Sequence, residues 1–220
     1  MRRTMRAFVL WLVISLTVAP LALLSSLTMV GTLGFVVIAL VRQYGGVLGL
    51  LLSGSGLVAS YAVAVAVHEV GHVLGGGSVG WTARFVRVGP VCWTRIGKSW
   101  RIGWTPRSSW LTGKVETVLG PRDRWRLVVF LLAGPAANII LAAVAGGIAA
   151  APIPLPLRCG AGLLGVISLC LGVLSLVPLR ERGEASDGLN LWRLLAHGAL
   201  PLTIKRVAFE SAAPSSIRLG

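Results

Sequence analysis

The chain has 220 residues, 55% of them hydrophobic, with a mean hydropathy of +0.82 and a formal net charge of +14. This composition is typical of a multi-pass membrane protein and leaves no long soluble segment, so we expect one membrane domain over residues 1–220. The charge alone would fit nucleic-acid binding, but membrane proteins usually carry their Lys and Arg in cytoplasmic loops, where they contact anionic lipid. We therefore expect the lipid bilayer as a partner and no nucleic acid.

Two other kinds of site find no support in the sequence. The three cysteines, Cys92, Cys159 and Cys170, are odd in number and widely spaced, which argues against a disulfide framework or a paired-thiol metal site. We expect them to be small buried residues. No glycine-rich phosphate loop follows a predicted strand, so we expect no nucleotide.

The first membrane region is an uncharged run from Ala7 to Val41, preceded by three arginines. Because it is much longer than the roughly 7–15 apolar residues of a signal peptide, we interpret it as a retained anchor. Its length exceeds one span of about 20 residues and falls short of two. Pro20 and the Ser25-Ser26 step could kink or turn it, so the sequence leaves open whether residues 7–41 form one membrane segment or two.

After a polar break at 42–46, the second membrane region runs from Val47 to Gly77 and carries His68, Glu69 and His72. A charged side chain at the centre of a membrane helix costs roughly 3 kcal/mol on insertion scales, so ionisable residues there are functional candidates by default. Three glycines at 75–77 then end the predicted helix. We expect the three ionisable residues to lie inside the membrane, near one of its surfaces.

The spacing His-Glu-x-x-His has a direct chemical meaning. On an α-helix the two histidines lie on one face and can hold one metal ion, while Glu69, rotated by about 100°, can act as a general base without being a ligand. With this residue composition the motif arises by chance in about one chain in a thousand. The alternative is a pair of buried histidines bonded to backbone carbonyls, and it leaves a buried Glu69 that would still need a partner.

The segment from Trp81 to Arg126 has a different character, with ten Lys or Arg against two acidic residues, and it holds six of the eight Trp. Interleaved Trp and Arg can bind single-stranded nucleic acid, but between membrane spans they favour an interfacial belt. Within this segment, Val91 to Trp104 is predicted to form a short β-hairpin in a cytoplasmic loop, with Trp100 and Ile102 on one face. We expect this hairpin to bind substrate, because its edge strand can pair with an unwound segment.

The third membrane region runs from Leu127 to Leu157 and contains Gly134-Pro135-Ala136-Ala137-Asn138. Proline interrupts the backbone hydrogen-bond ladder at this depth, and Asn138 adds a polar side chain. Taken alone, both fit a tolerated kink with Asn138 bonded to a neighbouring helix. After the last apolar run, Gly160 to Val177, the sequence predicts a charged linker, Asp187-Gly188, an amphipathic helix at 189–197 and a cytoplasmic tail at 198–220.

Together these runs predict an all-α multi-pass fold with about four transmembrane helices. With four crossings, the N-terminus, the basic segment and the tail share one side, which collects every Lys and Arg except Arg42 and Arg158. Because loops rich in Lys and Arg stay in the cytoplasm, we place that side there. The His-Glu-x-x-His motif then lies towards the cytoplasmic side of the cell membrane.

Three features stand together: His68 to His72 in a membrane helix, Gly134 to Asn138 in the next, and Asp187-Gly188 after the last. This combination resembles the site-2 protease family of intramembrane zinc metalloproteases, and the similarity covers a three-helix catalytic core at about residues 57–197. Two differences from the usual pattern are visible. Ser175 stands where the family commonly has Asn, and the linker from Pro178 to Asp187 is longer and more charged.

The resemblance implies one zinc ion held by His68, His72 and Asp187, with Glu69 as the catalytic base. Two histidines and one carboxylate leave a fourth position open, as catalytic rather than structural zinc sites do. The resemblance also maps a family asparagine onto Asn138, which is expected to contact the substrate or support the site. The implied activity is an endopeptidase that cuts a single-span membrane protein in or near its transmembrane segment, as in regulated intramembrane proteolysis.

The sequence also leaves two other functions open. A metal-binding membrane transporter or chaperone would place polar residues along several helices, whereas here they gather at one depth. A catalytically inactive scaffold would more readily have lost Glu69 or one of the two histidines. Metal content together with cleavage of a model substrate separates these three functions.

Overall fold

The structure is a computed structural model of the whole chain, and it describes residues 2–107, 110–118, 124–181 and 184–197. The tail expected at 198–220 lies outside the described residues. In chain order the elements are α1 (Arg2–Tyr44), α2 (Gly46–Ser78), β1 (Thr82–Val88), β2 (Val91–Ile96), β3 (Ser99–Trp104), β4 (Gly113–Val118), α3 (Arg124–Ala150), α4 (Leu155–Leu176), β5 (Arg180–Glu181), β6 (Glu184–Ala185) and α5 (Asp187–His197).

Four of the described helices are long and apolar enough to cross a membrane: α1 from Leu16 onward, α2, α3 and α4. This confirms the prediction of about four spanning helices, whereas a four-stranded sheet makes the fold mostly helical rather than all-α. The run at 7–41 belongs to one continuous helix, because Pro20 is accommodated inside α1. The hydroxyls of Ser25 and Ser26 donate to the carbonyl of Ala22 and so stay within the helix instead of turning the chain.

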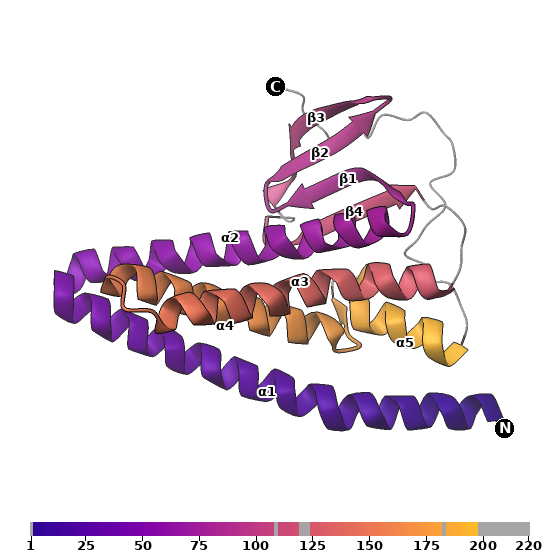
Figure 1. Cartoon of the computed structure of the whole chain (residues 1–220), viewed down its shortest axis with the longest axis horizontal. Helices are drawn as coiled ribbons and strands as arrows, with labels where there is room; N and C mark the ends of the chain where they lie inside the picture. The colour runs from indigo at the N-terminus through magenta and orange to yellow at the C-terminus, as the bar shows by residue number, and fades with distance from the viewer. Residues whose placement is uncertain (1, 108–109, 119–123, 182–183, 198–220) are drawn as a thin grey trace.

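Successive spanning helices run in opposite directions along the bundle (Figure 1). The α1–α2 and α3–α4 connections lie at one end, and the N-terminus and α5 lie at the other. The chain reverses between α1 and α2 at Gly45, whose φ of 84° favours glycine. α4 packs against all three other spans, and the buried cluster at one end of the bundle consists of Val36, Leu40, Ala64, Cys159, Leu163 and Ile167.

The basic segment forms a four-stranded antiparallel sheet in the order β3-β2-β1-β4. The predicted hairpin is present as β2 and β3, with Trp93 opposite Ile102 and a turn at Gly97. β1 and β4 were not predicted, because their pairing joins residues far apart in sequence and is interrupted by an irregularity between Ala83 and Phe85. All three cysteines are buried and free, as expected, and burial raises the pKa of the Cys92 thiol in β2.

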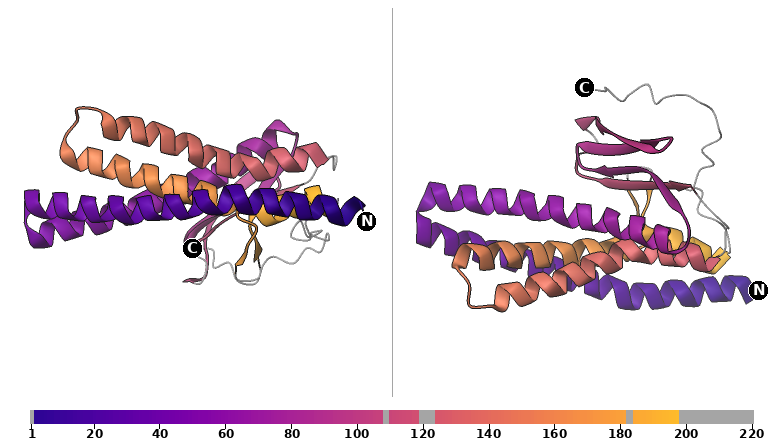
Figure 2. Two further views of the ribbon diagram at one scale, coloured as in Figure 1. Left: turned by 90° about the horizontal axis from the view of Figure 1, so that it is seen from below. Right: turned by 45° about the horizontal axis from the view of Figure 1, so that its top comes forward.

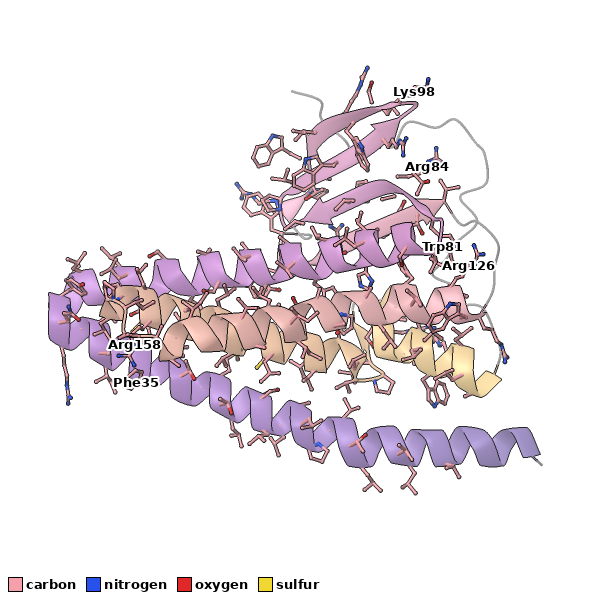
Figure 3. All side chains as sticks on the ribbon, viewed as in Figure 1. Phe35, Trp81, Arg84, Lys98, Arg126 and Arg158 are labelled. Atoms are coloured by element: carbon pink, nitrogen blue, oxygen red, sulfur yellow. The ribbon has the colours of Figure 1, made fainter. Side chains whose placement is uncertain are left out.

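The sheet lies alongside the second half of α2 rather than beyond the end of the helix bundle (Figures 1 and 2). β1 and β4 contact α2, and β3 forms the opposite edge of the sheet. A buried cluster of Trp81, Leu127 and Leu194 ties the start of the sheet to α3 and α5. Arg126 donates from Nη1 to the carbonyl of Val79 at 3.0 Å, beside Trp81 (Figure 3).

α2 and α3 cross closely enough to exclude side chains from part of α2. A Cβ atom added at Gly71 would lie 3.0 Å from the Cα of Gly134 and would also overlap the carbonyl of Ala133. A Cβ added at Gly75 would overlap the methyl group of Ala133. The glycines of α2 therefore let α3 pass directly over the histidine-bearing face, as small residues do at helix contacts in membranes.

A bulky residue at position 75 is expected to separate α2 from α3. We predict that Gly75→Val destabilises the folded protein by about 1–3 kcal/mol, because the packed contact with Ala133 leaves no room for the added methyl groups. Thermal unfolding of the detergent-purified protein, followed by tryptophan fluorescence, measures the change. Gly54→Ala is the control, since nothing lies within 4 Å of a Cβ at that position. Equal midpoints for Gly75→Val and the unaltered protein would contradict this account of the crossing.

Candidate metal centre

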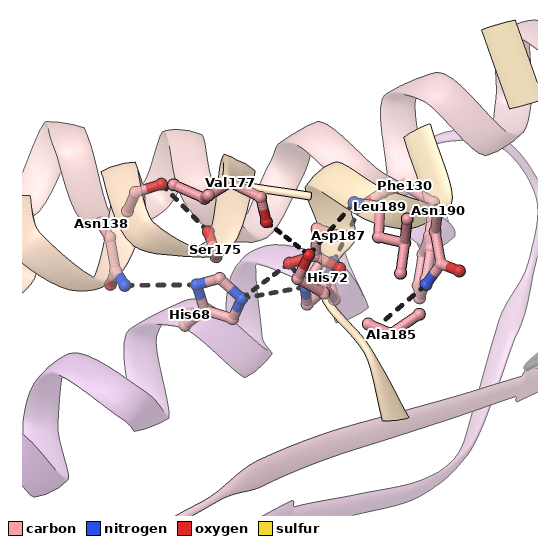
Figure 4. Close-up of polar contacts among 12 residues, drawn as sticks. His68, His72, Phe130, Asn138, Ser175, Val177, Ala185, Asp187, Leu189 and Asn190 are labelled. Atoms are coloured by element: carbon pink, nitrogen blue, oxygen red, sulfur yellow. Dashed lines mark hydrogen bonds and ion pairs between the residues drawn. The ribbon is translucent and has the colours of Figure 1, made fainter. Parts of the chain in front are cut away.

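Three possible metal ligands meet where α2 faces the start of α5 (Figure 4). His68 and His72 come from successive turns of α2, and Asp187 is the first residue of α5. Oδ2 of Asp187 lies 3.2 Å from Nε2 of His68 and 3.3 Å from Nε2 of His72, and the two Nε2 atoms lie 3.2 Å apart.

These spacings fit a tetrahedral zinc site. Ligand atoms bound to zinc at roughly 2.0–2.1 Å in tetrahedral directions stand about 3.3 Å apart. The donor set of two imidazoles and one carboxylate is also the one that catalytic zinc sites use. Three electron-rich atoms in a largely buried place favour a cation between them, so the residues fit a zinc ion by both geometry and chemistry.

His72 is held by the backbone of α3. Its Nδ1 donates to the carbonyl of Phe130 at 2.8 Å, which leaves Nε2 with a free electron pair directed at Asp187. Gly134 makes this possible, since a Cβ atom there would overlap Nε2 of the His72 ring. Sequence reasoning did not find Phe130, because a contact with a backbone carbonyl has no side-chain signature. Gly134 is the sequence signal from which the close approach of α3 to the His72 ring could have been inferred.

His68 is held by Asn138, which is fully buried. The Asn138 amide nitrogen lies 3.2 Å from Nδ1 of His68, and the Asn138 amide oxygen has no hydrogen-bond partner among the residues that the structure describes. A His68 that offers Nε2 to a cation carries its proton on Nδ1 and needs an acceptor there. Rotating the Asn138 side-chain amide by half a turn exchanges its nitrogen and oxygen, and the amide oxygen then accepts the proton of Nδ1. Asn138 is therefore placed to support a ligand, one of the two roles that the resemblance implied.

Phe130, Gly134 and Asn138 lie on one face of α3, since they follow one another at intervals of four residues. α3 runs antiparallel to α2, so its earlier residue meets His72 and its later one meets His68 (Figure 4). A single helix face thus holds both imidazoles by their Nδ1 atoms.

Glu69 lies between the two histidines in sequence and is 6% exposed. Its carboxyl group lies against Gly113, the first residue of β4, where any Cβ atom would overlap it. The preceding Leu111 accepts a hydrogen bond from the Tyr61 hydroxyl of α2 at 2.5 Å. The start of β4 therefore forms a wall beside Glu69, and sequence reasoning missed it because β4 itself was not predicted.

Trp100 and Ile102 do not lie at this site. They are 45% and 65% exposed on β3, which is the edge of the sheet opposite to β4. The residues brought together around Asp187 come from α2, α3, α5 and the start of β4.

The site lies towards one end of the bundle. Phe130 follows Arg126 by four residues, so the His72 contact lies about 6 Å along α3 from that charged side chain. α2 has 33 residues and a length of about 50 Å, which exceeds the roughly 30 Å hydrocarbon core of a bilayer. The metal centre therefore lies near the end of the bundle that carries Arg126.

Fold and site define a multi-pass membrane protein with a candidate metal centre in its helix bundle. The sequence model of peptidase family M50 matches residues 56–157, so this stretch of the chain is similar to that family, the site-2 protease family of membrane zinc metalloproteases. At the level of the matched family, this similarity supports an intramembrane metallopeptidase. The matched stretch contains His68, Glu69, His72 and Asn138, whereas Asp187 lies beyond it and is placed by the fold. No curated protein and no solved structure matches the chain.

Asn138 is expected to support metal binding as a hydrogen-bond acceptor. We predict that Asn138→Ala weakens zinc binding by about 10- to 100-fold, the usual effect of removing a partner of a metal-binding histidine. Asn138→Asp should bind zinc nearly as well as the unaltered protein, because it keeps an acceptor oxygen. Competition with a chromophoric chelator measures both affinities.

Ser168→Ala is the matched control, since Ser168 is also a fully buried polar residue whose hydroxyl has no hydrogen-bond partner among the described residues. This control should leave zinc affinity unchanged. An Asn138→Asp variant as weak as Asn138→Ala would show that the amide does not act as an acceptor.

Proposed function

We propose that this protein is an intramembrane zinc endopeptidase of site-2 protease type. Its substrate is a single-span membrane protein, cut in or near its transmembrane segment as a step of regulated intramembrane proteolysis. The observation that carries the proposal is the convergence of His68, His72 and Asp187 on one point, with Glu69 beside them on the same membrane-spanning helix. The match of residues 56–157 to the model of peptidase family M50 supports it.

Each residue of the site has a separate task in this proposal. His68, His72 and Asp187 would hold the ion, which supplies a Lewis acid and a nucleophilic water when bound. Glu69 accepts a proton from the attacking water and returns it to the amine that leaves when the peptide C–N bond breaks. Phe130 and Asn138 keep the imidazoles oriented.

The substrate must unwind to reach these groups, because a helix hides its carbonyls in internal hydrogen bonds. The sheet has two edges that could pair with the unwound segment. β4 runs along α2 and begins at Gly113 beside Glu69, so we place the scissile part of the substrate there. Substrate binding by Trp100 and Ile102 on β3 stays a prediction, and their exposure fits contact with a more distant part of the same substrate.

We propose that the active site faces the cytoplasm. The described basic side chains support this, since Lys98, Arg84 and Arg126 lie on the sheet side of the molecule and Arg158 lies near the far end of the bundle (Figure 3). Loops rich in Lys and Arg stay in the cytoplasm. The products that carry the cytoplasmic part of the substrate would then be released on that side.

Two substitutions separate metal binding from catalysis. We predict that Glu69→Gln keeps zinc but lowers hydrolysis of a model transmembrane substrate by at least about 100-fold, because it removes the general base. Asp187→Asn should lose both zinc and hydrolysis. Metal analysis and gel-based cleavage of the purified variants measure the two effects. Turnover near that of the unaltered protein in Glu69→Gln would refute the proposed role of Glu69.

The orientation is tested with a chain whose three cysteines are replaced by alanine. We predict that Arg107→Cys is shielded from a membrane-impermeant thiol reagent added to intact cells, because the sheet segment lies in the cytoplasm. Arg158→Cys, at the opposite end of the bundle, should react under the same conditions. The reverse labelling pattern would place the active site on the outer side of the membrane.

A further inference from the structure

The segment between α4 and α5 carries Asp187 to the site, and it is longer than the family resemblance implies. In the structure, the described residues of this segment form two short paired strands. β5 and β6 pair with each other, with Arg180 opposite Ala185 and Glu181 opposite Glu184. The backbone N–H of Ser186 donates to the carbonyl of Leu179 at 3.0 Å, and the N–H of Leu179 donates to Oγ of Ser186 at 3.1 Å. The chain therefore leaves at Leu179 and returns to the same place at Ser186.

Ser186 also joins the two helices that flank this hairpin. Its hydroxyl donates to the carbonyl of Val177, just beyond α4, at 2.6 Å. The same oxygen accepts from the N–H of Leu189 in the first turn of α5 at 3.1 Å, which is the contact of a helix N-cap. The Ser186 carbonyl accepts the N–H of Asn190 at 3.0 Å. One side chain thus bonds the end of α4, the base of the hairpin and the start of α5.

The residue after Asp187 is held as tightly as the residue before it. A Cβ atom at Gly188 would overlap the carbonyl of Leu176, so the first turn of α5 packs directly on the last turn of α4. Asp187 lies between these two anchored positions and points its carboxylate at His68 and His72 (Figure 4). Its place is set by the contact of α4 with α5 and not by the length of the linker.

We propose that Ser186 is the positioning residue for Asp187. It closes the β5–β6 hairpin at its base, caps α5 and so holds the Asp187 carboxylate opposite the two imidazoles whatever the hairpin contains. This inference rests on the proposed function, because it takes Asp187 as a metal ligand. In this inference the Ser186 side chain contributes to metal affinity as well as to the stability of the fold.

The test measures cobalt(II) affinity and the cobalt absorption spectrum of the purified full chain, neither of which depends on hydrolysis. Ser186→Ala should bind cobalt about 2- to 30-fold more weakly, because the cap that anchors the residue before Asp187 is lost, and should change the spectrum. Ser186→Thr keeps the hydroxyl and should restore both. Ser175→Ala is the matched control, since the Ser175 hydroxyl donates to the carbonyl of Gly172 within α4, away from the hairpin and α5.

A second pair of variants tests the independence from linker length. Two glycines inserted between Glu181 and Glu184 should leave cobalt affinity unchanged while Ser186 is present, and should weaken it further in Ser186→Ala. An affinity equal to that of the unaltered protein in Ser186→Ala, even with a lowered unfolding temperature, would overturn the inference and leave the proposed function intact. Failure of the unaltered protein to bind cobalt or zinc would instead overturn the proposed function.

Discussion

Three electron-rich atoms, two imidazole nitrogens and one carboxylate oxygen, lie 3.2 or 3.3 Å from one another inside the bundle. Burying such a cluster in the low-dielectric interior of the bundle costs free energy unless a cation lies between the three atoms. The rest of the structure serves to hold it. α3 bonds the Nδ1 atoms of both histidines, the glycines of α2 let α3 come close enough to do so, and Ser186 fixes the start of α5.

The features that sequence reasoning predicted are local in the chain. The spans follow from runs of apolar residues, the shared face of His68 and His72 follows from helical periodicity, and the β2–β3 hairpin follows from alternation around Gly97. The family resemblance added Asp187 and Asn138, which no local pattern would have joined to the motif. The single helix at 7–41 was left undecided, because proline inside an apolar run is compatible with either a turn or a continuous helix.

The features that were missed depend on contacts between distant residues. The pairing of β1 with β4 decides that Gly113, rather than the predicted β3 edge, lies beside Glu69. The Phe130 carbonyl reaches His72 only because two helices cross at one register. The linker before Asp187 is longer and more charged than the family pattern, yet its two short strands return the chain to Leu179 at Ser186. Such contacts are set by tertiary packing, which periodicity does not encode.

The central claim is that one zinc ion is held by two histidines and one carboxylate within the membrane bundle. Zinc K-edge X-ray absorption of the purified protein tests it most directly. The account predicts about one zinc per chain with only nitrogen and oxygen neighbours at roughly 2.0–2.1 Å and the scattering signature of two imidazoles. Sulfur neighbours at about 2.3 Å, or a chain purified without chelators that holds no stoichiometric metal, would contradict it.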